Sequence, residues 1–356
     1  MPITESTYTV TVLFAIAASL LAILLLRPIA PKLSLLDIPN GRKQHSGAVP
    51  LIGGLAIYLT LLLVLGGKIS ADIMLGYYLA CAAVIVILGA FDDALDLSVK
   101  LRLAVQLIVG LAMIYSLDLH ISNLGNLFGF GPVELGIFGI PFTLIAVIAA
   151  INAFNMTDGI DGLAGLLSMV SFGSIAVFML LWGQASQALL PLVFIAALLP
   201  YLAFNLGWDK HKKIFMGDAG SMLIGLSVIW LLLIATQSET ASFRPVTALW
   251  LIAVPLMDMV AIMLRRMLKG QSPFQADREH LHHISLRLGL NSRESLILIT
   301  ALAWIFACVG IIGEYLLIPE VAMLALFFLV FALYIGLMQN IWRIISAIRH
   351  NFVNRR

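Results

Sequence analysis

The stretch Tyr8–Leu26, YTVTVLFAIAASLLAILLL, decides the fold class of this chain. It holds no charged residue, and its length is close to the ~20 apolar residues that a helix needs to cross the hydrocarbon core of a bilayer. No Lys or Arg precedes it and no small-residue cleavage site follows it, so we expect a retained transmembrane helix rather than a signal peptide. Because backbone groups in lipid must find partners within their own segment, the expected form is an α-helix.

Apolar segments of this kind recur along the whole chain. Hydrophobic residues make up 61% of the 356 residues and charged residues only 11%, against about 25% charged in soluble domains. The mean hydropathy is +1.04. The sequence therefore predicts an all-α polytopic membrane protein, a single domain over residues 1–356 with about eleven transmembrane helices. We place these spans at 8–26, 50–67, 73–91, 103–118, 136–152, 163–182, 188–206, 220–236, 245–264, 295–313 and 321–342.

The distribution of positive charge predicts the orientation of these spans. The positive-inside rule counts Lys and Arg in short loops. If the N-terminus is outside, nineteen of the 21 Lys and Arg residues fall on the inner side, and only Lys68 and Arg244 fall outside. The C-terminus is then cytoplasmic. The inner loops that we expect to carry the chemistry are 27–49, 92–102, 153–163, 207–219 and 265–294.

The composition also argues against two kinds of partner or site. A net charge of +2 gives no reason to expect nucleic acid as a partner. The two cysteines, Cys81 and Cys308, each lie inside an apolar run. Neither a disulfide framework nor a thiolate metal site is therefore available.

An acidic motif, Asp92-Asp93-Ala94-Leu95-Asp96, follows the third apolar segment. If the helix continues through it, Asp92 and Asp96 share one face, because they are four positions apart. Neighbouring carboxylates repel one another unless a cation lies between them, and hard oxygen ligands suit Mg²⁺ or Mn²⁺. The motif is typical of a site for a metal ion and a diphosphate; an acidic helix end in solvent is the alternative.

Two further inner motifs carry oxygen ligands. Asn152, Asn155, Asp158 and Asp161 recur every third residue, which on a helix gives one polar stripe that must face a wet cavity. Gly159 and Gly162 could instead let the chain turn out of the helix. Asp218 lies among small residues in FMGDAGS just before a span, where it could ligate a metal or only cap the helix.

Histidines and basic residues suggest anion binding. His280, His282 and His283 do not match the H-E-x-x-H pattern of zinc helices, and nearby arginines, Arg266 among them, oppose a dication and favour an anion. We therefore interpret them as phosphate contacts, with zinc and solvated loop residues as alternatives. Lys43 and His45 add a basic loop beside a turn. Asp258 lies within the ninth span and is expected to face the bundle, with Arg265 as a candidate partner.

Together these motifs resemble those of the polyprenyl-phosphate N-acetylhexosamine-1-phosphate transferases. The likeness covers almost the whole chain and includes LDIPN at 36–40, INAFN at 151–155, FMGD at 215–218, PLMDM at 255–259 and HLHH at 280–283. It implies transfer of N-acetylglucosamine-1-phosphate from UDP-N-acetylglucosamine to undecaprenyl phosphate, with release of UMP, in O-antigen or common-antigen assembly. Asp96, where the peptidoglycan enzymes have Lys, favours this donor; another UDP-N-acetylhexosamine is the alternative.

The motifs and the resemblance also predict the site. Mg²⁺, for which Mn²⁺ can substitute, is expected on Asp218, Asn155, Asp92 and Asp93. Catalytic roles are expected for Asp92, Asp93, Asp158 and Asp161. Substrate contacts are expected from Asp96, Asn152, Asn205, His45, Lys43, Arg266, His280, His282 and His283.

The expected mechanism is direct attack by the lipid phosphate, positioned by Asp92 and Asp93; a phospho-enzyme on Asp93 is the rival scheme. The resemblance implies a bacterial inner-membrane protein with a periplasmic N-terminus and a cytoplasmic active site. The oligomeric state, a homodimer included, stays open. A secondary transporter or an intramembrane aspartyl hydrolase would place its ionisable groups within the spans rather than at their inner ends.

Overall fold

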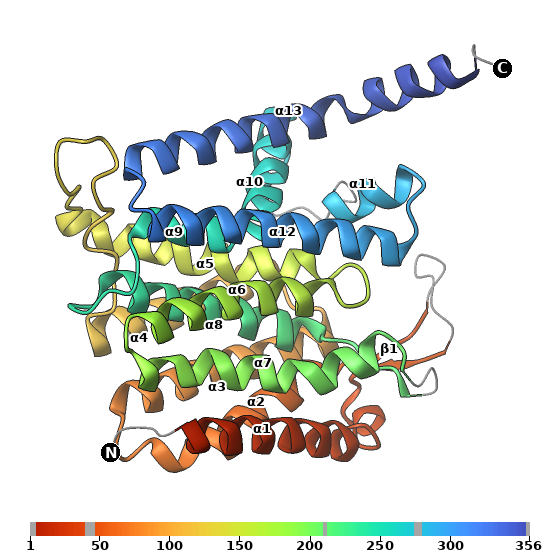
Figure 1. Ribbon diagram of the computed structural model, residues 1–356. Helices are drawn as coiled ribbons and strands as arrows, with labels where there is room; N and C mark the ends of the chain where they lie inside the picture. Colours follow the sequence, from red (N-terminus) through yellow and green to blue (C-terminus); the bar gives the residue numbers. More distant parts are fainter. Residues whose placement is uncertain (1–4, 40–46, 209–211, 274–279, 354–356) are drawn as a thin grey trace.

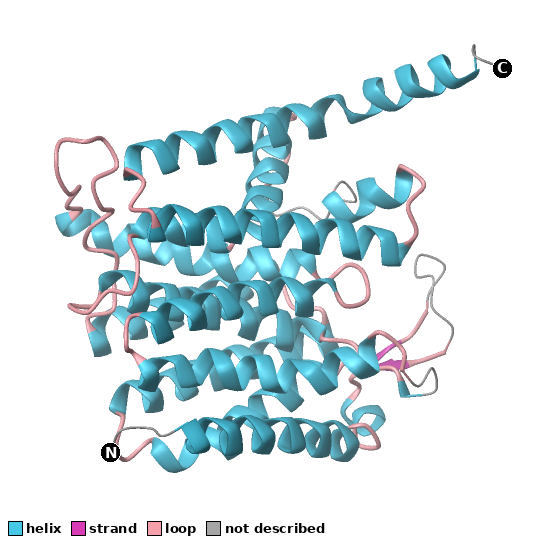
Figure 2. Ribbon diagram, in the orientation of Figure 1, coloured by secondary structure: helices cyan, strands magenta, loops and turns pink. Residues whose placement is uncertain are grey.

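The computed structural model of the protein describes residues 5–39, 47–208, 212–273 and 280–353. Long helices lie side by side in a bundle, and their connections gather at two ends (Figure 1). Strand is confined, in the described ranges, to one small hairpin (Figure 2). We call the end of the bundle that carries this pair of strands the hairpin end.

Nine of the eleven predicted spans are confirmed as long apolar helices. Within the described residues, nine helices are long and apolar enough to cross a membrane. They are α1 (Glu5–Leu26), α3 (Ile73–Leu95), α4 (Val99–Leu117), α5 (Gly139–Thr157), α6 (Leu163–Leu181), α7 (Ala185–Asn205), α8 (Gly217–Gln237), α12 (Ser292–Tyr315) and α13 (Glu320–Val353). The second predicted span is the shorter apolar helix α2 (Gly53–Leu65) with the 3-10 turn η2 (Gly66–Lys68). Smaller elements are η1 (Ala30–Leu33), η3 (Gly136–Phe138) and α11 (Leu281–Arg287).

The ninth predicted span is not one helix. It consists of α9 (Pro245–Leu251) and α10 (Ala253–Leu268), bent by 83° at the break. Pro255 is the physical reason, because it has no N–H to donate to Leu251 and its ring crowds that carbonyl. The freed Leu251 carbonyl accepts instead a hydrogen bond of 2.9 Å from the Ser171 hydroxyl of α6. The expectation of a continuous helix over 245–264 was wrong, and α10 runs across the bundle towards α13 (Figure 1).

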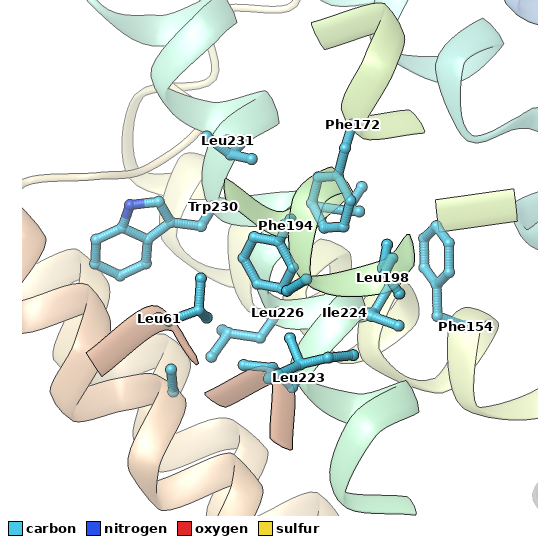
Figure 3. Packing of buried hydrophobic residues seen from close by; sticks show 14 of the residues in the cluster. Leu61, Phe154, Phe172, Phe194, Leu198, Leu223, Ile224, Leu226, Trp230 and Leu231 are labelled. Atoms are coloured by element: carbon cyan, nitrogen blue, oxygen red, sulfur yellow. The ribbon is translucent and has the colours of Figure 1, made fainter. Parts of the chain in front are cut away.

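Helix α8 forms the centre of the bundle. The protein itself buries 94% of its apolar window, against 28% for α1 and 17% for α13. Its side chains, Leu223 and Trp230 among them, pack against residues of neighbouring helices (Figure 3). The rings of Phe172 and Phe194 stack beside it with centroids 4.5 Å apart. The protein core is therefore arranged around α8, and the outer helices present their apolar faces outward.

Glycines let neighbouring backbones reach the first turn of α8. A Cβ added at Gly54 of α2 would lie 2.1 Å from the Gly220 nitrogen, and one added at Gly89 of α3 would lie 2.4 Å from the Ala219 nitrogen. Small residues permit such close approach of membrane helices. The start of α8 is thereby fixed against α2 and α3.

The hairpin was not predicted. Strands β1 (Leu36–Asp37) and β2 (Val49–Pro50) pair antiparallel. The Phe215 N–H then donates to the Pro50 carbonyl at 2.9 Å, and the Gly53 N–H donates to the Phe215 carbonyl at 2.9 Å. These bonds join the first inner loop to the segment that leads into α8, at the same end of the bundle as α11 (Figure 1).

Candidate active site

Asp93 caps the N-terminus of α8 from the end of α3. Its Oδ1 accepts from the Asp218 N–H at 2.9 Å, and its Oδ2 accepts from the Ala219 N–H at 3.3 Å. The first N–H groups of a helix have no partner within the helix, and the helix dipole is positive at this end. A carboxylate there is therefore stabilised both by hydrogen bonds and by the dipole. Gly217 makes this contact possible: it has φ +72°, and a Cβ at this position would lie 2.5 Å from Asp93 Oδ2.

Asn155 binds the carboxylate of Asp218 from α5. The Asn155 Nδ2 donates to Asp218 Oδ1 at 2.7 Å and to the Ser221 hydroxyl at 3.0 Å. The structure thus brings together two of the predicted metal ligands. Ser221, which belongs to the motif but was not predicted as a site residue, orients the amide.

Asp92 is paired with Arg102 and does not share a helix face with Asp96. The buried Asp92 carboxylate accepts from Arg102 Nη1 at 2.6 Å and from the Leu97 N–H at 2.9 Å. Helix α3 ends at Leu95, and Asp96 is an exposed left-handed C-cap with φ 51°. The expected Asp92–Asp96 face was therefore wrong. Arg102 had been counted only as a topological charge, and nothing else in the sequence marks it.

The loop after α5 carries the next two acids. Helix α5 ends at Thr157, so the polar stripe is helical only as far as Asn155, and Asp158 and Asp161 lie in a turn. Asp161 pairs with Lys213 at 2.6 Å. Surrounding protein atoms that displace water, and then the carboxylates of Asp218 and Asp161, raise the pKa of Asp158 to about 7, although part of its surface is open to solvent.

Two of the predicted substrate-binding amides have protein partners. Asn205 is only 2% exposed; its Oδ1 accepts from the Gly162 N–H at 2.6 Å, and its Nδ2 donates to the Ile214 carbonyl at 2.9 Å. It therefore ties the loop after α5 to the segment before α8 and positions both. Asn152 donates to Gln106 Oε1 of α4 at 2.8 Å.

The three histidines form a stack of rings at the start of α11. The rings of His280 and His282 are nearly parallel with centroids 5.6 Å apart, and those of His282 and His283 are 4.2 Å apart. His282 lies against the aspartate loop, since a Cβ on Gly159 would lie 2.0 Å from its Nε2. Burial, and then the neighbouring His283 and His280, lower the pKa of His282 to about 3.

Asp258 is buried, as expected. It binds His280 at 2.9 Å, the Leu281 N–H and the Tyr334 hydroxyl, and not the candidate partner Arg265. The buried Arg266 donates from Nη1 to the Pro273 carbonyl at 2.5 Å. Lys43 and His45 lie outside the described residues.

The donor set at α8 fits Mg²⁺ with substrate phosphates. The carboxylates of Asp92, Asp93 and Asp158 all lie close enough to that of Asp218 to repel it electrostatically. Such crowding of carboxylates favours a bound cation, and Mg²⁺ takes one or two carboxylates together with waters and phosphates. In the described ranges no group of three or more His, Cys, Asp or Glu side chains is arranged to hold a metal. Asp218 and Asn155, which the structure brings together, are the residues that would hold the ion.

Known proteins resemble this chain over most of its length. A family model for glycosyl transferase family 4 matches residues 75–236, which hold all six aspartates of the predicted site. Undecaprenyl-phosphate alpha-N-acetylglucosaminyl 1-phosphate transferase from Escherichia coli K12 is 46% identical over 334 residues, 93% of this chain and 90% of the relative. The Salmonella typhimurium protein of that name is 48% identical over 94% of this chain and 91% of its own length. The one from Pasteurella multocida is 45% identical over 92% and 93%.

These identities extend far beyond the matched motifs and cover both the central helix and the histidine loop. They confirm the resemblance seen in the sequence and the choice of an enzyme over a transporter. The chain therefore belongs to glycosyl transferase family 4, together with the undecaprenyl-phosphate alpha-N-acetylglucosaminyl 1-phosphate transferases.

Proposed function

We propose that this protein transfers N-acetylglucosamine-1-phosphate from UDP-N-acetylglucosamine to undecaprenyl phosphate. UMP leaves, and undecaprenyl-diphosphate-N-acetylglucosamine remains as the first lipid-linked intermediate of an O-antigen or common-antigen type polysaccharide. The observation that carries the proposal is the set of aspartates around the first turn of α8, where Asp93 and Asn155 hold Asp218. The named activity of relatives 45–48% identical over nine tenths of the chain supports it.

The reaction needs alignment and charge neutralisation more than covalent help from the protein. A phosphomonoester has a second pKa of about 6, so the lipid phosphate is already a nucleophile near neutral pH. Its oxygen attacks the β-phosphorus of the donor, and the bond from that phosphorus to the oxygen of UMP breaks with its electron pair. Asp92, which is paired with Arg102, would orient the acceptor phosphate.

Direct attack is favoured over a phospho-enzyme by the contacts of Asp93. Both of its oxygens accept hydrogen bonds from the first turn of α8, which stabilises the carboxylate and restrains it from attacking phosphorus. Mg²⁺ on Asp218 and Asn155 would neutralise the charge of the donor diphosphate when bound. The histidine stack provides donors for the same diphosphate.

We place the hairpin end at the cytoplasmic face of a bacterial inner membrane. The support is the split of nineteen to two in the Lys and Arg residues, together with the gathering of the inner loops at one end of the bundle (Figure 1).

Purified protein tests the reaction directly. With undecaprenyl phosphate and Mg²⁺, UDP-N-acetylglucosamine should give UMP and the lipid-diphosphate sugar in equal amounts. A panel of UDP-N-acetylhexosamines measures sugar preference, and turnover of none of them with either Mg²⁺ or Mn²⁺ would refute the proposal. Exchange of labelled UMP into the donor without lipid would instead support the phospho-enzyme.

A further inference from the structure

Asp258 joins three elements that are distant in the sequence. From α10, its Oδ2 lies 2.9 Å from His280 Nδ1 at the start of α11. Its Oδ1 accepts from the Leu281 N–H at 3.0 Å and from the Tyr334 hydroxyl of α13 at 2.7 Å. The Asp258 side chain is 5% exposed. A buried carboxylate is retained only when its oxygens have partners, and here each oxygen has at least one.

These contacts determine which way the His280 ring is turned. A carboxylate can only accept, so Nδ1 of His280 must carry the proton that lies between the two groups. The Nε2 is then the nitrogen left to meet another ligand, with a tautomer and a ring plane set by Asp258. The backbone bond to Leu281 fixes the first turn of α11 in the same place. His282, stacked on His280, continues the connection to Gly159 and the aspartate loop.

We propose that Asp258 and Tyr334 are positioning residues for the donor diphosphate. Asp258 holds His280 with Nε2 directed to the ligand, and Tyr334 fixes the Asp258 carboxylate from the last helix. Helix α13, 17% of whose apolar window is buried, thereby becomes part of the donor site without contributing a ligand to it. The proposal rests on the proposed function, since the donor is the UDP-sugar.

Steady-state kinetics of Asp258→Asn and Tyr334→Phe separate positioning from mere support of the fold. Loss of a partner that orients a histidine typically lowers affinity or activity about 10–100-fold. We expect KM for UDP-N-acetylglucosamine to rise about tenfold or more in Asp258→Asn and about fivefold in Tyr334→Phe, with KM for undecaprenyl phosphate within about twofold of wild type. Asp258→Glu, which keeps the carboxylate, should recover part of the donor affinity.

Tyr315→Phe is the matched control, because Tyr315 is 74% exposed on α12. It should leave both KM values unchanged. The proposal would be overturned if folded Tyr334→Phe and Asp258→Asn had the donor KM of wild type. It would also be overturned if the KM values for donor and acceptor rose by the same factor. If Asp258→Asn does not fold, Tyr334→Phe alone decides.

A second readout does not depend on activity. In protein labelled with ¹⁵N-histidine, the His280 signal, assigned by its absence in His280→Gln, should show a protonated Nδ1 in wild type. In Asp258→Asn the amide nitrogen can donate, and the proton should move to Nε2. If His280 in the wild type carried its proton only on Nε2, the proposed positioning of His280 by Asp258 would be refuted. Absence of all transferase activity would refute the proposed function and leave this measurement valid.

Discussion

Four active-site aspartates each have a different protein partner, and these partners separate the roles of residues that look alike in sequence. Asp92 binds Arg102, Asp161 binds Lys213, and Asp93 binds the first turn of α8. Asp218 instead accepts from the neutral amide of Asn155, and in the part of the chain that the structure describes no Lys or Arg forms an ion pair with it. Its charge is left for a cation, which makes it the aspartate most dependent on metal.

Asp218→Asn should therefore abolish turnover. Removing one electrostatic group that stabilises a transition state typically lowers kcat about 10²–10³-fold, and loss of a metal anchor should reach at least that. The kcat of wild type and variant, measured at saturating substrates over about 0.1–10 mM Mg²⁺, tests this expectation. Asp118→Asn is the control, since its carboxylate is 91% exposed outside the acidic cluster. Near-normal turnover in Asp218→Asn would remove this residue from the metal site.

His282 should make the fold sensitive to acid. The pKa of His282 is about 3 in the folded protein and 6.5 for an unperturbed histidine side chain, so between these pH values the unfolded state binds more protons. Folding stability due to His282 is therefore present above about pH 6.5 and is lost as the pH falls towards 3. His282→Asn cannot titrate, and its thermal midpoint should fall less between pH 7 and pH 5 than that of wild type. Equal decreases of the thermal midpoint in wild type and His282→Asn would contradict the low pKa of His282. The control His120→Asn should show the same decrease as wild type.

At the scale of elements, the break between α9 and α10 depends on one hydroxyl outside it. The Ser171–Leu251 bond satisfies the carbonyl that Pro255 leaves without a partner. Ser171→Ala should therefore destabilise the protein by about 1–3 kcal/mol, the cost of an unsatisfied buried polar group. Ser174→Ala is matched, because its hydroxyl bonds only the Val170 carbonyl of its own helix. Unfolding in graded denaturant compares them, and equal midpoints for the two variants would contradict this role.

The elements also show what could be predicted from sequence. Apolar length located nine of the eleven spans as long helices, because a segment in lipid can satisfy its own backbone groups only as a helix. The motifs located Asp218 and Asn155, because both lie at span ends of the same side. The break was missed although Pro255 signals it, since a proline in a long apolar run is often accommodated. The partners Arg102 and Tyr334 were missed because their contacts depend on packing between segments, which no local pattern records.

At the scale of the whole molecule, orientation is the main prediction. In a background with Cys308 replaced by Ser, Glu239→Cys on the α8–α9 connection should react with a membrane-impermeant maleimide in intact cells. Lys269→Cys, exposed at the end of α10, should react only after the membrane is opened. This follows from the split of nineteen to two in the positive charges. Labelling with the opposite pattern would invert the assignment and place the aspartates outside.

The glycine contacts around α8 have a consequence for natural variation. Gly54 and Gly89 have no side chain that could take part in the chemistry, yet any side chain there would collide with the backbone at Asp218, Ala219 and Gly220. Gly225 has the same relation to α5, where an added Cβ would lie 2.5 Å from Ile151 Cα. Under selection for activity, a saturation library should accept almost nothing but glycine at these three positions, while lipid-facing neighbours accept any apolar residue. Among related proteins, the glycines that contact or belong to the central helix should then vary as little as the active-site aspartates do.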